Sequence, residues 1–91
     1  MAWERKLIRT VRIRNSQKTG VLARLLTAIA EAGGNTGSLV LLTETSQNVV
    51  RDITISAENE AHLEAILEAM RKNEGTRIIE VRDEVLELIR S

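Results

Sequence analysis

The stretch Gln-Lys-Thr-Gly-Val-Leu at residues 17–22 marks a change in the period of the apolar residues. Before it, over residues 7–14, apolar and polar residues alternate, which predicts a strand with one apolar face. After it, apolar residues recur at intervals of three and four, which predicts an amphipathic helix over residues 20–32 with Thr19 as its N-cap. The residues of this helix expected to be buried are Leu22, Leu25, Leu26 and Ile29.

The rest of the chain continues as strands and one more helix. The expected elements are a strand over residues 38–44, a turn over 45–48, a strand over 49–57, a helix capped by Asn59, and a strand over 77–82. Residues 85–89 are expected either to continue the last strand past a bulge or to form a short added strand.

The second strand is apolar on both faces. Leu39 and Leu41 alternate with Val40 and Leu42, so each side of the strand carries large aliphatic side chains. We therefore expect helices to cover one face and a partner chain to cover the other.

The order strand-helix-strand-strand-helix-strand predicts an α+β ferredoxin-like βαββαβ sandwich. In this fold an antiparallel four-stranded sheet carries both helices on one face. Right-handed crossovers place the first and third strands in the middle of the sheet. We expect one domain over residues 1–91, with residues 1–6 as an N-terminal extension and 83–91 as a C-terminal strand extension.

Composition excludes several classes of function. The 13 basic and 13 acidic residues balance, so no net charge draws the chain to nucleic acid or to a membrane surface. The absence of cysteine excludes disulfides and thiolate sites, and one histidine, His62, is too few for a histidine-rich metal site or a catalytic triad. We expect His62 to be a solvated surface residue, and we predict no catalytic residue, metal site or cofactor.

The chain lacks the sequence features of a membrane or secreted protein. Its longest apolar run, residues 38–43, is far too short to span a bilayer, and the N-terminus lacks the apolar core of a signal peptide. We therefore expect a cytoplasmic protein. Trp3 is the single aromatic residue, so an RNA-recognition module with base-stacking side chains is excluded.

Two further uses of a ferredoxin-like sandwich fit the residues poorly. A metal-carrier module needs a cysteine pair in the first loop, which this chain lacks. An acylphosphatase-like enzyme needs an arginine, a water-orienting asparagine and a cradle of backbone donors. Arg14 and Asn35 are candidates for the two side chains, but the first loop lacks the glycine-rich cradle.

The two turns that flank the first helix resemble those of the ACT domain, a regulatory module that binds amino acids or other small metabolites. In that family an Asn or Asp precedes a helix-opening glycine by three residues, a Leu follows that glycine by two, and Gly-x-Asn ends the helix. Gly20 matches the helix-opening glycine, Gln17 takes the Asn/Asp position, and Gly33 and Asn35 match the Gly-x-Asn. Thr19 stands where the family often has proline.

The resemblance covers roughly residues 7–89. Residues 50–55, together with Glu74 and Gly75, look most like the N-terminal ACT domain of some bacterial and archaeal NAD-dependent malic enzymes. If that likeness holds, a chain that stops at Ser91 without a dehydrogenase portion is an excised domain or a shortened relative.

The resemblance implies a binding site made from both turns. A ligand carboxylate would accept N–H bonds at the start of the helix, where the helix dipole also favours it, and an ammonium would meet the amide oxygens of Asn35 and Gln17. The implied ligand-binding residues are Asn15, Gln17, Thr19, Gly20, Val21, Leu22, Gly33, Gly34 and Asn35. The glycines and Asn35 also have a purely structural interpretation, as residues that begin or end a helix or cap a turn.

The implied function is a non-catalytic regulatory module. It would bind an amino acid or organic acid at the interface of a homodimer or higher homo-oligomer, and control an attached or associated metabolic enzyme such as malic enzyme. The alternative is an assembly module that dimerises and binds no ligand.

Overall fold

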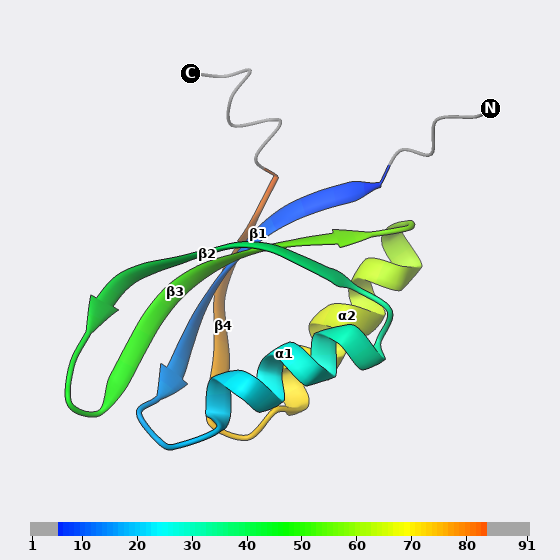
Figure 1. Ribbon diagram of the computed structural model, residues 1–91. Helices are drawn as coiled ribbons and strands as arrows, with labels where there is room; N and C mark the ends of the chain where they lie inside the picture. The colour runs from blue at the N-terminus through cyan, green and yellow to red at the C-terminus, as the bar shows by residue number, and fades with distance from the viewer. Residues whose placement is uncertain (1–5, 84–91) are drawn as a thin grey trace, which may run out of the picture.

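Both helices lie on one face of a four-stranded antiparallel sheet in the computed structural model, which describes residues 6–83 (Figure 1). The elements are β1 (Leu7–Ser16), α1 (Val21–Glu31), β2 (Asn35–Glu44), β3 (Asn48–Ala57), α2 (Glu60–Lys72) and β4 (Thr76–Arg82). The strand order is β2-β3-β1-β4, so β1 and β3 are central, and the ferredoxin-like arrangement expected from the sequence is confirmed. The stretch at residues 85–89 lies outside the described residues.

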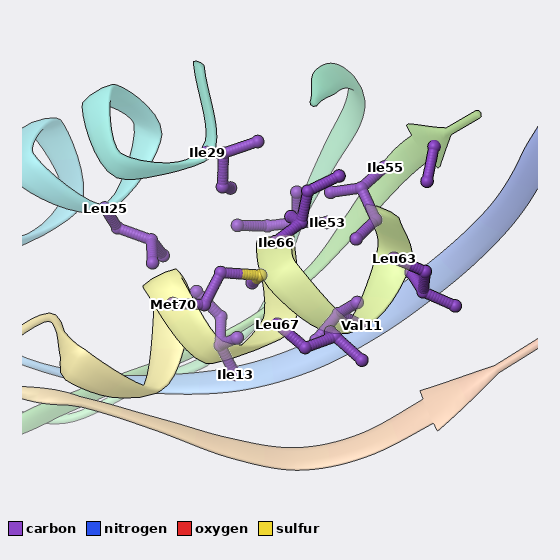
Figure 2. Close-up of a cluster of buried hydrophobic side chains, with 11 residues drawn as sticks. Val11, Ile13, Leu25, Ile29, Ile53, Ile55, Leu63, Ile66, Leu67 and Met70 are labelled. Atoms are coloured by element: carbon purple, nitrogen blue, oxygen red, sulfur yellow. The ribbon is translucent and has the colours of Figure 1, made fainter. Parts of the chain in front are cut away.

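The hydrophobic core forms where the two helices meet the central strands, and Figure 2 shows its side chains converging there. Val11 and Ile13 of β1 and Ile53 and Ile55 of β3 point to the same side because their positions alternate along each strand. The helices contribute Leu25, Ile29, Leu63, Ile66, Leu67 and Met70. The buried residues of α2 recur at intervals of three and four, as in an amphipathic helix.

The buried face of α1 differs from the expected one. Val21, Leu25 and Ile29 are buried, whereas Leu22 and Leu26 pack only at the edge of the core. The apolar pattern predicted the helix but not how far round its surface the core extends.

The strand β2 is exposed along its whole length, so the expectation that helices cover one of its faces is wrong. Register places Leu39 opposite Ile53 and Leu41 opposite Arg51, on the helix side of the sheet, yet these leucines are 42% and 55% exposed. The helices pack over β1 and β3, and the hairpin end of β2 and β3 extends beyond them (Figure 1). β2 is therefore an edge strand that has apolar side chains on both faces and one unpaired edge.

The ends of the helices agree in part with the expected caps. Thr19 is not the N-cap of α1: that position is Gly20, with φ of 87°, and no side chain caps the helix. Asn59 does cap α2, because its side chain accepts a hydrogen bond of 2.8 Å from the N–H of His62. At the end of α1, Gly34 N–H donates to Ile29 O and Gly33 N–H to Ala30 O, both at 2.9 Å, the Schellman pattern that a left-handed glycine allows.

His62 is a hydrogen-bonding link between the helices, so the expectation of a solvated surface histidine is wrong. Its Nε2 donates to Ala32 O at 2.8 Å, and its Nδ1 accepts from the N–H of Glu58 at 2.9 Å. The side chain thereby satisfies a carbonyl at the end of α1 and a free N–H at the start of α2. Neither helix of the described part is long and apolar enough to cross a membrane.

On the sheet face opposite the helices, Asp52 is held by two arginines. Arg12 Nε donates to Asp52 Oδ1 at 2.9 Å, Arg82 Nη2 donates to Asp52 Oδ2 at 2.7 Å, and the Asp52 side chain is only 12% exposed. The hydrogen bonds from Arg12 and then Arg82 hold the pKa of the Asp52 carboxyl below its ordinary value of 3.8, against the opposing effect of burial. The group joins β3, β1 and β4 side by side.

We expect Asp52→Asn to lower the free energy of unfolding by about 1–2 kcal/mol near pH 7, because charged hydrogen bonds are lost. The folded-state pKa lies below the unfolded one, so this contribution is present above about pH 4 and is lost as the pH falls through the folded pKa. Urea denaturation of both proteins across that range measures the difference. Glu64→Gln, on the exposed side of α2, is the matched control and should change little; an Asp52→Asn deficit that persists in strong acid would contradict the assignment.

We expect Gly75→Ala to destabilise the fold by about 1–3 kcal/mol. Gly75 has φ of 87°, and an added Cβ would lie 2.8 Å from Ser16 Oγ and 3.2 Å from a Val21 methyl. Gly37→Ala is the control, because its φ is not positive and its nearest neighbours, atoms of Thr54, are at 3.6 Å. Thermal and urea melts of both variants test this, and equal stability of the two would refute it.

Candidate functional site

The residues that the sequence assigned to a ligand site lie in two groups at opposite ends of α1 (Figure 1). One group covers Asn15 and residues 17–22, at the start of the helix, and the other covers Gly33, Gly34 and Asn35, just after its end. The eleven residues of α1 span about 16 Å at 1.5 Å per residue. A single chain therefore does not bring the two groups together around one small molecule.

At the start of α1 the backbone N–H groups of Leu22 and Ala23 are unused within residues 6–83, whereas Val21 N–H donates to Lys18 O at 3.3 Å. The helix has no side-chain cap and no acidic residue in its first turn, so the partial positive charge of its N-terminus is not neutralised locally. The first helical hydrogen bond runs from Arg24 N–H to Gly20 O at 2.9 Å. The guanidinium of Arg24 folds back over Gly20, since a Cβ added to that glycine would lie 2.8 Å from Arg24 Nη1. This turn is suited to a carboxylate or another anion.

Asn15 is a buried structural residue, only 1% exposed, behind the start of α1. Its Nδ2 donates to Thr76 Oγ1 at 2.8 Å, and the same oxygen accepts from Asn73 Nδ2 at 2.9 Å. Asn73 Nδ2 also reaches Val21 O at 3.2 Å. The cluster links the ends of β1 and α2 to the starts of β4 and α1. Among the described residues, Asn15 Oδ1 is the one buried side-chain atom without a hydrogen-bond partner.

Gln17 is fastened to the turn between β2 and β3. Its backbone N–H donates to Gln47 O at 2.9 Å, and its side-chain Nε2 donates to Glu44 Oε2 at 2.8 Å and to Thr45 O at 3.2 Å. The side-chain amide hydrogens are therefore already used, while Oε1 is left as an acceptor. Through Gln17 the loop before α1 is physically connected to the far end of β2.

At the other end of α1, Gly33 and Gly34 have structural roles. Gly33 takes the left-handed conformation of the Schellman turn, and a Cβ on Gly34 would lie 2.8 Å from Ile66 Cδ1 and 3.1 Å from Ile29 Cγ2. Close packing of α1 and α2 against this turn therefore requires glycine at residue 34. The structural roles of Gly33 and Gly34 therefore explain why both are glycine, without a ligand.

Asn35 lines a hollow of about 230 Å³ at the start of β2. The other lining residues are Ile8, Thr36, Gly37, Thr54, Ile55 and Ser56. None of these side chains carries a charge, so the hollow suits a neutral or apolar group better than an ammonium. This lining contains no acidic residue that could bind the ammonium group expected to contact Asn35.

A larger hollow of about 460 Å³ lies between α1 and α2, and the sequence reasoning missed it. Alanines at 23, 28 and 69 leave room between the helices, and Arg24, Lys72, Thr27, Glu31 and Asn73 complete the lining. The signal was present in the sequence, because these alanines fall outside the buried stripes of both helices. Small residues there prevent the outer surfaces of the two helices from closing over one another.

The comparisons with known proteins agree with the expected resemblance. No family model matches the sequence. The chain is 36% identical over 81 residues to NAD-dependent malic enzyme 1 of Bacillus subtilis, covering 88% of this chain and 18% of that enzyme. It is 30% identical over 74 residues to the NAD-dependent malic enzyme of Geobacillus stearothermophilus, covering 81% and 16%. The chain thus spans less than a fifth of the length of these relatives.

Solved structures share the fold. The ACT domain of GTP pyrophosphokinase from Chlorobium tepidum superposes with a TM-score of 0.66 at 19% identity, covering 86% of this chain and 97% of that domain. The de novo designed protein Foldit4 also superposes, with a TM-score of 0.60 at 15% identity, covering 86% and 94%, so the fold by itself carries no function. The chain has the fold of the ACT domain, and in sequence it is a relative of a segment of NAD-dependent malic enzymes.

Proposed function

We propose that this domain is a non-catalytic regulatory module that binds an amino acid or a small organic acid and controls a metabolic enzyme of the malic-enzyme type. The observation that carries the proposal is the uncapped N-terminus of α1, with the Arg24 guanidinium folded over Gly20. The similarity to a segment of malic enzymes links the chain to enzymes of that type, and the fold shared with an ACT domain supports a regulatory role.

The carboxylate of the ligand binds at the start of α1 in this proposal. The free N–H groups of the first turn point along the helix axis toward the ligand, and the helix dipole favours its negative charge. The Arg24 side chain adds a charged donor beside them, and Gln17 Oε1 offers an acceptor on the loop side. Asn15 supports this turn from behind rather than contacting the ligand.

The second half of the site comes from another copy of the chain. Because β2 is an exposed edge strand, two copies can pair through it about a two-fold axis. Antiparallel pairing of two β2 strands about their midpoints places Asn35 of the partner subunit beside Glu44. Gln17 is bonded to Glu44, so this dimer joins the two groups of residues that one chain keeps apart.

Regulation follows from this arrangement by linkage. A ligand held between the two subunits binds the paired state better than the separate chains, and so shifts the population toward the pair. The bond between Gln17 and Glu44 provides the physical contact between the ligand loop and the paired strand.

We expect the purified chain to be a dimer at micromolar concentration, and Leu41→Lys to make it monomeric. Leu41 is 55% exposed in the single chain, so a lysine there disturbs the pair rather than the monomer fold. Ile79→Lys is the matched control, because Ile79 is 48% exposed on the opposite edge strand, and it should remain dimeric. Sedimentation equilibrium measures both, and a wild-type monomer would disprove pairing through β2.

We expect at least one compound among the twenty amino acids and the carboxylates of central metabolism to raise the melting temperature of the chain. A ligand at about 100 times its dissociation constant adds about 2.7 kcal/mol, which is several degrees for a domain of this size. Asn35→Ala should abolish the shift, whereas the control Glu68→Ala, on the exposed side of α2, should keep it.

The competing function is an assembly module without a ligand. The uncharged lining around Asn35 and the engagement of the Gln17 amide by the hairpin favour it. A dimeric chain whose melting temperature responds to no compound of the screen would establish this alternative in place of the sensor.

A further inference from the structure

The sheet face opposite the helices has its charges arranged in rows that cross the strands. One row holds Glu80, Arg12, Asp52 and Val40, and its charges alternate in sign. Arg82 joins this row by donating to Asp52 at 2.7 Å, and it lies 3.4 Å from Glu80. Within residues 6–83, the two acids of this face, Asp52 and Glu80, are therefore engaged by Arg12 and Arg82.

The next row has no such balance. Register places Arg77 directly opposite Arg14, with Val50 on the other side of Arg14 and Thr43 beyond it. Arg14 and Arg77 are both exposed, and within residues 6–83 neither guanidinium has an ion pair or a side-chain hydrogen bond. Like charges directly opposite each other on antiparallel strands destabilise the pairing. The row therefore has an uncompensated double positive charge.

The geometry of the Arg14 and Arg77 pair indicates which ligand would neutralise its positive charge. Side chains directly opposite on antiparallel strands start about 5 Å apart at their Cβ atoms, so two guanidinium groups can converge on one small group. Each guanidinium presents a planar fork of donors that fits two oxygens of a phosphate or carboxylate. A single negative charge neutralises only one arginine, whereas a doubly charged oxyanion neutralises both.

We propose that Arg14 and Arg77 form a binding site for a small, doubly charged oxyanion, a phosphate group or a dicarboxylate, with Val50 beside it for the body of the ligand. The site lies on the face of the sheet away from α1, so it is separate from the carboxylate site at the start of that helix. Charge complementarity decides the class of ligand, because the acids nearest to the pair are already bonded to other arginines.

The test is thermal melting at low ionic strength, with inorganic phosphate compared with sodium chloride of equal ionic strength. Phosphate should raise the melting temperature by roughly 5 °C more than sodium chloride once well above its dissociation constant. Arg14→Gln and Arg77→Gln should each remove this difference. The NMR signals of the Arg14 and Arg77 Nε–H groups should move in the wild-type protein on the same titration.

A second readout separates a ligand site from a merely structural role. In sodium chloride at low ionic strength, Arg77→Gln should melt at a higher temperature than the wild type, because the repulsion between the two arginines is gone. A structural contribution from Arg77 would move the melting temperature the other way.

A control variant distinguishes this site from other positively charged sites on the protein. Lys72→Gln, in the hollow between the helices, should keep the phosphate response. The proposal is overturned if the wild type responds no more to phosphate than to sodium chloride. It is also overturned if both arginine variants keep the response, or if Lys72→Gln alone removes it.

Discussion

The packing of two antiparallel helices over the two central strands is the constraint on which the rest of this molecule depends. Val11, Ile13, Ile53 and Ile55 fill the space beneath α1 and α2 because they alternate on one side of β1 and β3. With two helices the cover is complete over the centre, whereas every residue of the edge strand β2 stays exposed. The exposed strand is therefore a consequence of how much surface two helices of eleven and thirteen residues can bury.

Polar interactions then fix the ends of the packed elements. His62 joins the end of α1 to the start of α2, and Asn15 and Asn73 share Thr76 at the opposite end of the helix pair. Such groups contribute because each satisfies backbone or side-chain atoms that the core would otherwise leave without partners. The turns next to α1 are thereby held in place, and the proposed carboxylate site at its start is built on a rigid support.

The proposed functions use what this packing leaves unsatisfied. The core does not use the N-terminal N–H groups of α1, the edge of β2 or the pair Arg14 and Arg77. The helix start has unused hydrogen-bond donors, the β2 strand has an unpaired edge with apolar side chains, and the arginine pair has uncompensated positive charge. The pair Arg14 and Arg77 lies on the sheet face away from α1, so an oxyanion can be bound there independently of the carboxylate and the second subunit, whose binding is linked.

The sequence by itself determined the order of strands and helices along the chain, the amphipathic period of α1 and the cap at Asn59, because local periodicity and capping chemistry do not depend on distant contacts. It also pointed to the ACT fold through the residues at the two ends of α1. Only the tertiary structure decided that β2 is uncovered, that His62 bridges the helices, and that Gln17 reaches Glu44. Those outcomes depend on which elements meet in space, since a residue's burial and partners come from chain segments that its own neighbours in the sequence do not specify.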